Sequence, residues 1–179
     1  GIQFHISSGN AVFVRESLDR GLIDFGIVFG PVDLTKYHAL KVPVRDIWGV
    51  LMRKDSPLAE KESIRREDLW DQPLIVSQQE SNGGQVLQWL KRDPADLRIV
   101  ATYNLIYNAT YLVEHGIGYA LCLDRLVNTM GRNLAFRPIS PELSVGLYMV
   151  TKKYQTFSPA AKVFYERLKA FTTAAGSET

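Results

Sequence analysis

Strand and helix patterns alternate along the chain, and this alternation constrains the fold more than any other feature. Residues 2–6 alternate apolar and polar side chains, as a strand with one covered face does. Ala11, Val14 and Leu18 follow at helical spacings of three and four, and residues 23–29 are almost entirely apolar. Such an apolar strand is typical of a parallel sheet covered by helices on both faces. The opening therefore predicts a strand-helix-strand unit and an α/β fold with mainly parallel sheets.

The same two patterns continue to the C-terminus. Ser158 is expected to cap the last helix, with Pro159 at its first position. Residues 172–179 are small and polar, and we expect them to be disordered. We predict further strands at residues 40–44, 47–52, 74–76, 98–102, 119–123 and 145–151, and helices at residues 11–20, 86–90, 109–113, 124–130 and 158–171.

Composition and charge narrow the class of protein. Hydrophobic residues make up 46% of the chain and charged residues 22%, the balance of a protein that buries a core. The net charge of +2 is too small to predict nucleic-acid binding by this chain. A single cysteine, Cys122, excludes an internal disulfide and favours a reducing compartment. We find no membrane-length apolar run and no signal-peptide pattern, so we expect a cytoplasmic protein.

The residue types that carry catalysis and cofactor chemistry show none of the usual spacings. His5, His38 and His115 lie far apart in sequence, and no phosphate-binding Gly-x-x-x-x-Gly-Lys loop occurs. Gly116 and Gly118 lack the third glycine of a dinucleotide-binding loop. No serine lies in a Gly-x-Ser-x-Gly turn. The sequence therefore predicts no metal, no cofactor and no enzyme activity.

Polar loops between strands and helices are the remaining candidates for a binding site. They lie at residues 8–10, at residues 81–84 and around residues 103–104. Helix starts leave backbone N–H groups free and carry partial positive charge, so such loops can bind carboxylates or phosphates. Ordinary helix capping is the simpler alternative for each loop taken singly.

Five motifs, in order, resemble the effector-binding domain of LysR-type transcription regulators, which has a two-lobed fold similar to the type 2 periplasmic binding proteins. Each motif is weak alone, but their common order covers essentially the whole chain. The motifs are 21–27, similar to G-x-(L/I)-D-x-(A/G)-I; 56–58, similar to H-P-L; 68–75, similar to D-L-x-x-x-P-L-I; 113–118, similar to V-x-x-G-x-G; and the helix start at 158–159.

Two departures from the family pattern stand out. Leu123 is followed by Asp124, where the family has a proline, so the local turn is expected to differ. The chain also starts at what resembles the second strand of the sensor domain, with neither the winged helix-turn-helix nor the first strand and helix before it. We therefore expect a fragment, which associates, aggregates or has an altered first lobe.

The resemblance implies two lobes joined by a two-stranded hinge, with a small and anionic effector bound between them. The first and incomplete lobe would comprise residues 1–46 and 147–171, and the second residues 47–146. The implied effector-binding residues are Ser8, Gly9, Asn10, Phe29, Gly30 and Pro31 in the first lobe and Ser81, Asn82, Gly83, Thr102 and Asn104 in the second.

The resemblance also implies a partner and a mechanism. The family pairs its sensor domains, here through the helix at residues 11–20, and contacts DNA only through the N-terminal domain. Effector binding would shift the population of domain arrangements and so control DNA binding. A solute-binding receptor of a transporter, which shares the fold, is the main alternative, and an enzyme on this fold is the third.

Overall fold

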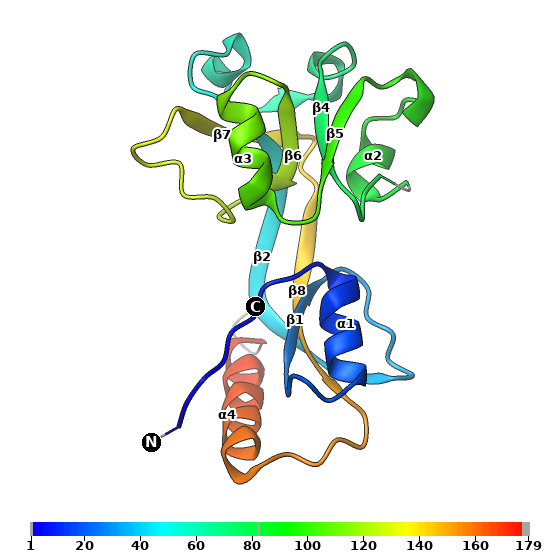
Figure 1. The fold of residues 1–179 in the computed structure, drawn as a ribbon, viewed down its shortest axis with the longest axis vertical. Coiled ribbons are helices and arrows are strands. Elements are labelled where there is room, and N and C mark those ends of the chain that lie inside the picture. Colours follow the sequence, from blue (N-terminus) through cyan, green and yellow to red (C-terminus); the bar gives the residue numbers. More distant parts are fainter. Residues whose placement is uncertain (1, 82, 177–179) are drawn as a thin grey trace. The chain divides into compact units, whose positions relative to one another are not determined.

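The computed structural model describes residues 2–81 and 83–176, and the chain divides into two compact units. Unit 1 comprises residues 1–45 and 145–179, and unit 2 comprises residues 46–144. The chain passes between the units twice, within the long strand β2 (Tyr37–Arg53) and within β8 (Ser144–Lys152) (Figure 1). The strands predicted at residues 40–44 and 47–52 are therefore parts of one strand.

Unit 1 has a small core between one helix and an antiparallel strand pair. Strand β1 pairs with β8, with Gly26 opposite Val150. Val14 and Leu18 on one helix face pack with Val28 and Val150 of these strands, as the helical spacing predicted. The helices and strands of this unit, besides the unit 1 parts of β2 and β8, are α1 (Ala11–Asp19), β1 (Gly26–Phe29) and α4 (Pro159–Gly176).

Both ends of α1 follow sequence signals. The Asn10 side-chain oxygen accepts the Phe13 N–H at 2.9 Å, which satisfies one of the free amides of the first turn. Gly21, at φ +68°, donates its N–H to the Leu18 carbonyl at 3.0 Å, and the Leu22 N–H reaches the Ser17 carbonyl at 2.8 Å. These two bonds form the Schellman motif that a C-terminal glycine favours.

Residues 2–6 form no strand, and that prediction was wrong. A strand needs a hydrogen-bonded neighbour, and within the described chain β1 is paired with β8 alone. Ile2, Phe4 and Ile6 are instead exposed, by 64%, 70% and 92%, and Phe4 makes only an edge contact with the Phe164 ring of α4. The alternation of apolar and polar side chains is therefore not sufficient for a strand at residues 2–6.

The last helix also differs from its prediction at its end. Ser158 caps α4 through its hydroxyl, which accepts the Ala161 N–H at 3.2 Å, as expected. The helix then continues to Gly176 instead of ending in disorder after Phe171. Alanine is the best helix former, which favours continuation through this alanine-containing segment. The Thr172 and Thr173 hydroxyls bond to the Lys169 carbonyl of the preceding turn. Residues 177–179 lie outside the described residues.

Unit 2 is a mixed sheet with helices, in which parallel and antiparallel strand pairs both occur, and this confirms the α/β class. Strand β4 pairs in parallel with β5 and β6, whereas β2 pairs antiparallel with β6 and β7. Strand β2 enters from unit 1, so its direction is not set by a helical crossover. The other strands and α-helices are β3 (Ile64–Arg65), β4 (Leu74–Ser77), α2 (Gln85–Trp89), β5 (Ile99–Tyr103), α3 (Ile106–Glu114), β6 (Tyr119–Leu123) and β7 (Leu134–Ser140).

Among the described residues, three short 3-10 helices lie in the connections, at Pro57–Glu60, Arg66–Asp68 and Pro94–Asp96. The main core of unit 2 packs α3 onto the sheet through Leu51, Ile75, Ala109, Val113 and Ala120. The strand order β2-β6-β4-β5 places the apolar strands β4 and β6 inside the sheet, where both of their faces are covered.

The Gly116–Gly118 segment closes α3 and starts β6. Gly116, at φ +73°, donates to the Val113 carbonyl at 2.9 Å and ends the helix as predicted. Gly118 serves a different purpose, because a Cβ there would lie 2.5 Å from the Pro73 carbonyl oxygen. The two glycines therefore meet backbone requirements and need no nucleotide to explain them.

Residues 124–130 form no helix, which corrects the expected short helix capped by Asp124. The Asp124 carboxylate instead accepts the Ile47 N–H at 2.8 Å, and the Asp124 N–H donates to the Ile47 carbonyl at 2.9 Å. Arg125 follows at φ +61°, outside the helical region. The missing proline of the family pattern thus coincides with a turn that is hydrogen-bonded to β2.

Candidate functional site

The unit 1 candidates lie at the start of α1 and the end of β1. Asn10 is occupied as the helix cap, so the capping alternative holds for this residue. Gly9 lies so close to Phe13 that a Cβ would be 2.1 Å from the phenylalanine ring, and Ser8 is exposed. The N–H groups of Ala11 and Val12 belong to the first turn, where helical geometry provides no backbone acceptor.

Phe29, Gly30 and Pro31 follow one another at the end of β1. The Phe29 side chain is 40% exposed, and the Gly30 N–H donates to the Gly146 carbonyl at 3.2 Å. Gly26 at the start of β1 lies against Val14 in the middle of α1, so β1 runs back toward the helix start. The two sets of unit 1 candidates therefore belong to the same end of this strand-helix pair.

The unit 2 candidates lie where the chain leaves the sheet, at one of its edges. Ser77 of β4 is paired with Tyr103 of β5, and the Gln78 N–H donates to the Tyr103 carbonyl at 2.8 Å. Loop 78–84 and the segment beginning at Asn104 therefore start side by side at the carboxyl ends of parallel strands. In α/β folds this edge is where ligands bind.

Within loop 78–84, hydrogen bonds fold the backbone back on itself. Ser81 donates its hydroxyl to the Gln78 carbonyl at 2.8 Å, so this hydroxyl is already engaged. The Gly83 carbonyl accepts the Gln88 side-chain amide at 2.8 Å. Asn82 lies outside the described residues.

Thr102 and Asn104 complete the unit 2 candidates, and both side chains are exposed. Thr102 belongs to the edge strand β5, opposite Val76. The Asn104 side-chain oxygen accepts the Leu105 N–H at 2.8 Å, just before α3. The Thr102 hydroxyl is therefore available to a ligand, whereas the Asn104 side-chain oxygen already accepts a backbone hydrogen bond.

Glu80 belongs to the same loop and was missed by the sequence analysis. Its carboxylate accepts the Val86 N–H at 2.8 Å, at the first turn of α2. Burial raises the pKa of this carboxyl, and the hydrogen bond from Val86 opposes that rise. The one signal in the sequence is an acidic residue before a Gly-Gly pair, which does not reveal where the side chain points.

Tyr103 and Tyr107 lie at the end of β5 and in the first turn of α3, and their surroundings differ. Tyr103 packs against the main core of unit 2 and donates its hydroxyl to the Leu121 carbonyl at 2.7 Å, and burial raises its pKa well above the ordinary value. Tyr107 is 60% exposed on α3. Core packing therefore accounts for Tyr103 alone.

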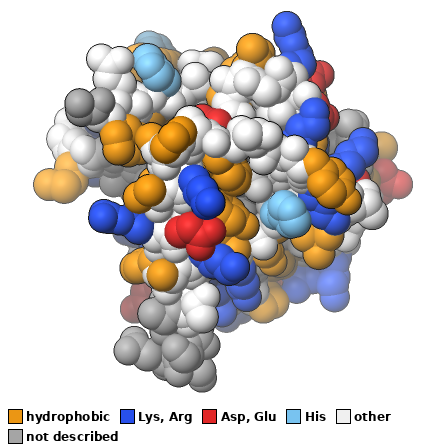
Figure 2. Space-filling model, turned by 90° about the horizontal axis from the view of Figure 1, so that it is seen from below, with side chains coloured by type: hydrophobic (Ala, Val, Ile, Leu, Met, Phe, Trp, Pro, Cys, Tyr) orange, Lys and Arg blue, Asp and Glu red, His pale blue; other side chains and the backbone are white. Residues whose placement is uncertain are grey.

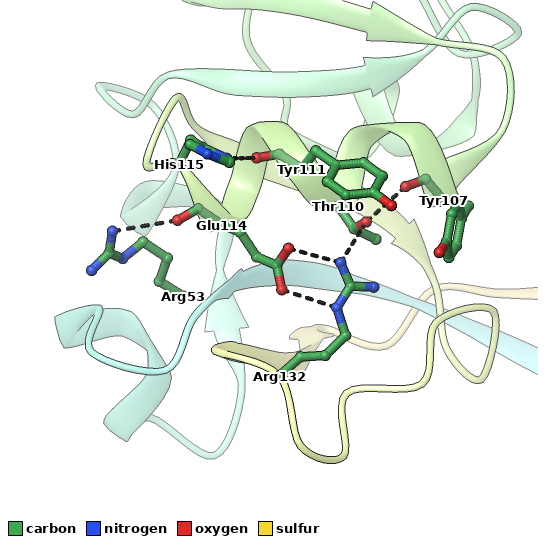
Figure 3. A network of polar contacts seen from close by, with 7 residues as sticks. All are labelled: Arg53, Tyr107, Thr110, Tyr111, Glu114, His115 and Arg132. Carbon is green, nitrogen blue, oxygen red and sulfur yellow. Dashed lines mark hydrogen bonds and ion pairs between the residues drawn. The ribbon is translucent and has the colours of Figure 1, made fainter.

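A second polar cluster lies on α3 and loop 124–133 (Figure 3). Arg132 forms a bidentate ion pair with Glu114, with N···O distances of 2.9 and 2.8 Å. It also donates to the buried Thr110 hydroxyl at 2.9 Å. Its guanidinium also lies 5.9 Å from the ring centres of Tyr107 and Tyr111. Arg132, Glu114 and the two tyrosines line an open hollow of about 470 Å³. Since Arg132 and Glu114 satisfy each other, the cluster anchors the loop to α3 and offers no unpaired charge.

Three further observations concern metal ligands, the cysteine thiol and membrane spans. No group of three or more His, Cys, Asp or Glu side chains within residues 2–81 and 83–176 could hold a metal ion. Burial raises the pKa of Cys122 to about 12, so its thiol is not a reactive thiolate. None of the helices in those residues has the length and hydrophobicity of a membrane span.

Comparison with known proteins decides the family. The model of the LysR substrate binding domain matches residues 1–172. This chain belongs to that family. The LysR domain is 25% identical over 173 residues to an uncharacterized HTH-type transcriptional regulator, YvbU, of Bacillus subtilis (strain 168). The match covers 94% of this chain and 57% of YvbU, so the chain spans little more than half of that relative.

Solved structures show the same fold. The effector binding domain of QuiR in complex with shikimate is similar with a TM-score of 0.77 at 17% identity, over 93% of this chain and 79% of that one. The regulatory domain of Synechocystis CcmR in complex with 2-PG is similar with a TM-score of 0.72 at 18% identity, over 91% and 80%. The LysR domain therefore has the expected two-lobed, type 2 periplasmic-binding-protein-like fold.

The family match confirms the interpretation as a ligand-sensing regulatory domain and gives no support to a transport receptor. The proteins matched are regulatory domains and not enzymes. On the face seen in Figure 2, Lys and Arg side chains are interspersed with acidic and hydrophobic ones. That surface is not the continuous basic face that nucleic-acid binding uses.

Proposed function

We propose that this LysR domain binds a small effector through polar loops at its strand ends. The intact regulator would use that binding to control its attachment to DNA, without any chemistry by this chain. One observation carries the proposal: the model of the LysR substrate binding domain matches residues 1–172. The polar loops at the strand ends of unit 2 agree with it. As a DNA-bound regulator, the protein would act in the cytoplasm.

The recognition groups we propose are loop residues at the strand ends of each unit. An effector carboxylate would meet the free first-turn amides of α1, where the helix dipole favours negative charge. The hydroxyl of Thr102 would donate to the effector from unit 2. The full proposed set is Ser8, Gly9, Asn10, Phe29, Gly30, Pro31, Ser81, Asn82, Gly83, Thr102 and Asn104.

Two complexes among the related structures support a small acid as effector. QuiR was solved with shikimate and CcmR with 2-PG. Both are distant relatives, so they support the kind of site and leave the effector of this chain open. A screen of metabolite acids by thermal shift is therefore the first experiment.

Thr102→Val tests the site, because it removes an exposed hydroxyl and keeps the side-chain volume. Loss of one hydrogen bond should weaken the effector found in the screen by about tenfold. Thr156→Val in unit 1 is the matched control, because Thr156 is also exposed and stands outside the proposed site. If Thr102→Val and Thr156→Val bind the effector with the same affinity, whether unchanged or weakened, the proposal is contradicted.

We also propose that α1 contributes to a dimer. Its outward face carries Arg15 and Glu16, with Val12 48% exposed beside them. Glu16→Arg should shift the sedimentation profile toward monomer, because like charges would then gather on the paired face. An unchanged profile would reject α1 as the interface.

A further inference from the structure

The hollow between α3 and loop 124–133 combines exposed apolar side chains with unused hydrogen-bond donors. Its volume of about 470 Å³ lies within the range of small-molecule pockets, about 300–1,000 Å³. Four of the side chains that line it, those of Tyr107, Tyr111, Leu126 and Met130, are between 46% and 83% exposed. Exposed apolar side chains that stand singly are ordinary, whereas a group of them around one hollow is typical of a binding surface.

The two tyrosine rings form a fixed wall of this hollow. Tyr107 and Tyr111 are four residues apart and therefore share one face of α3, while Ala109 and Val113 pack into the core of unit 2. The ring centres lie 5.9 Å apart, with an angle of 88° between the ring planes. A flat ring can stack on one tyrosine and meet the edge of the other, and aromatic pairs prefer both arrangements.

The polar groups that remain unused in the hollow are donors. Arg132 engages Glu114 and Thr110 through Nε and Nη2, and its Nη1 has no hydrogen-bond partner within the described residues (Figure 3). Two of the five N–H donors of a guanidinium belong to that nitrogen. The Asn128 side-chain oxygen accepts the Met130 N–H at 3.0 Å, which leaves the amide nitrogen of Asn128 as a further donor. A ligand in the hollow would therefore need an acceptor.

The charges that line the hollow cancel each other. Glu114 and Arg132 are its charged residues, and they are bonded to each other at 2.9 and 2.8 Å. Hydrogen bonds from Arg132 lower the pKa of Glu114, so this carboxylate is ionised at neutral pH. An anionic ligand would meet the charge of Glu114 as well as that of Arg132, and a cationic ligand would meet the reverse. The hollow therefore favours an uncharged molecule.

We propose that this hollow is a second ligand site, which takes an uncharged aromatic molecule with an oxygen acceptor, such as an aromatic amide. The ring would stack on the tyrosines, and the oxygen would accept from Nη1 of Arg132. None of the lining residues belongs to the set proposed for the effector, so the inference does not rest on the proposed function. The LysR domain would thus have two ligand sites with different charge preferences.

Benzamide and benzoate are the probes, because they share a ring and differ in charge. Their binding is followed by NMR of the 179-residue chain with carbon-13 in the methionine methyl groups. Of the three methionines, Met52 and Met149 are buried, so Met130 alone reports on the hollow. Benzamide should shift the Met130 signal in a saturable manner and bind about tenfold more tightly than benzoate. A Met130 signal that ignores benzamide, or an equal affinity for benzoate, would overturn the proposal.

Glu114→Gln tests the cancellation of charge. Glutamine keeps an oxygen that accepts from Arg132, but the guanidinium then has no counter-charge among the residues that line the hollow. The variant should bind benzoate more tightly than benzamide, the reverse of the wild type, because a charged acceptor makes the stronger bond to a guanidinium. Glu62→Gln, at an exposed position in unit 2, is the matched control and should keep the wild-type preference. A wild-type preference in Glu114→Gln would also overturn the proposal.

Tyr111→Leu provides a second test, which leaves the ion pair in place. Loss of the aromatic contact should weaken benzamide by about threefold to tenfold. Tyr154→Leu, at a 99% exposed position in unit 1, is the matched control and should bind benzamide as the wild type does. Equal benzamide affinities of the two variants would contradict a site on α3. A Met130 signal that moves when the free wild type is diluted would assign the hollow to a second copy of the chain, against the proposal.

Discussion

The two units bury their hydrophobic residues to very different extents. In unit 2, β4 and β6 are covered on both faces, and Ile75, Leu74 and Leu121 have no exposed surface. In unit 1, Leu18 is the one fully buried large side chain among the described residues. Ile27 of β1 remains 55% exposed, and the side chains of residues 2–6 are largely open to solvent.

The difference follows from how many strands each unit contributes to its sheet. Four strands in the order β2-β6-β4-β5 give unit 2 interior strands, whereas β1 in unit 1 has a neighbour on one side only within the described chain. An interior strand buries both faces and an edge strand does not. We therefore expect unit 1 to be the less stable of the two.

The largest expected effect compares the same substitution in the two units. Ile75→Ala should lower the free energy of unfolding by about 2–5 kcal/mol, because it leaves a cavity in a fully covered strand. Ile27→Ala should change it by no more than about 0.5 kcal/mol, since the side chain is mostly exposed. Urea titrations of both variants measure this. Similar losses would show that β1 is covered after all, for example by a second copy.

The three tryptophans of the chain allow the units to be followed separately. Trp48, Trp70 and Trp89 all belong to unit 2, whereas both units contribute to the far-UV circular dichroism. The dichroism of the wild type should therefore begin to fall at a lower urea concentration than the tryptophan fluorescence changes. Coincident transitions would mean that the units unfold together.

The next effect uses the glycines that end α1 and α3. Gly21 and Gly116 have φ of +68° and +73° and close the same motif, one in each unit. Alanine at either position should cost about 1–2 kcal/mol, because its Cβ crowds the following carbonyl. Gly116→Ala should move the fluorescence transition, and Gly21→Ala should move only the early dichroism change. If Gly21→Ala also shifts the fluorescence transition, then the unfolding of unit 1 and the unfolding of unit 2 are coupled.

The sequence predicted elements well where local pattern and burial agree. The apolar runs at residues 74–76 and 119–123 became β4 and β6, and Gly21 and Gly116 end helices as expected. Strand β7 was missed because Pro138 and Arg137 interrupt its apolar pattern. Arg137 is committed to the Ala59 and Lys61 carbonyls, a tertiary contact that no local pattern reveals.

The candidate site was predictable only as a set of loops. Strand-end position follows from the alternation of elements, so loop 78–84 and Asn104 could be singled out in advance. The contact of Glu80 with Val86 could not, because it depends on the close approach that Gly84 allows. Capping by Asn10 was foreseen as the simpler alternative, since its geometry is local.

The smallest expected effect is a difference in pH dependence between the units. The raised pKa of Glu80 means that its contribution to the stability of unit 2 is present at low pH and is lost as pH rises through the folded pKa. Hydrogen bonds from the Thr35 hydroxyl and N–H lower the pKa of Asp33 in unit 1, so its contribution is present at neutral pH and is lost as pH falls through the folded pKa.

Glu80→Gln and Asp33→Asn should therefore change the pH profiles in opposite directions. Relative to the wild type, Glu80→Gln should gain most stability near pH 7 and least near pH 4, in the fluorescence transition. Asp33→Asn should lose stability near neutral pH and come closest to the wild type in acid, in the early dichroism change alone. Because Asp33 is exposed and Glu80 half-buried, the Asp33 effect should be the smaller. Parallel profiles would mean that Glu80 is solvated as well as Asp33 is, and that unit 2 does not desolvate its loop.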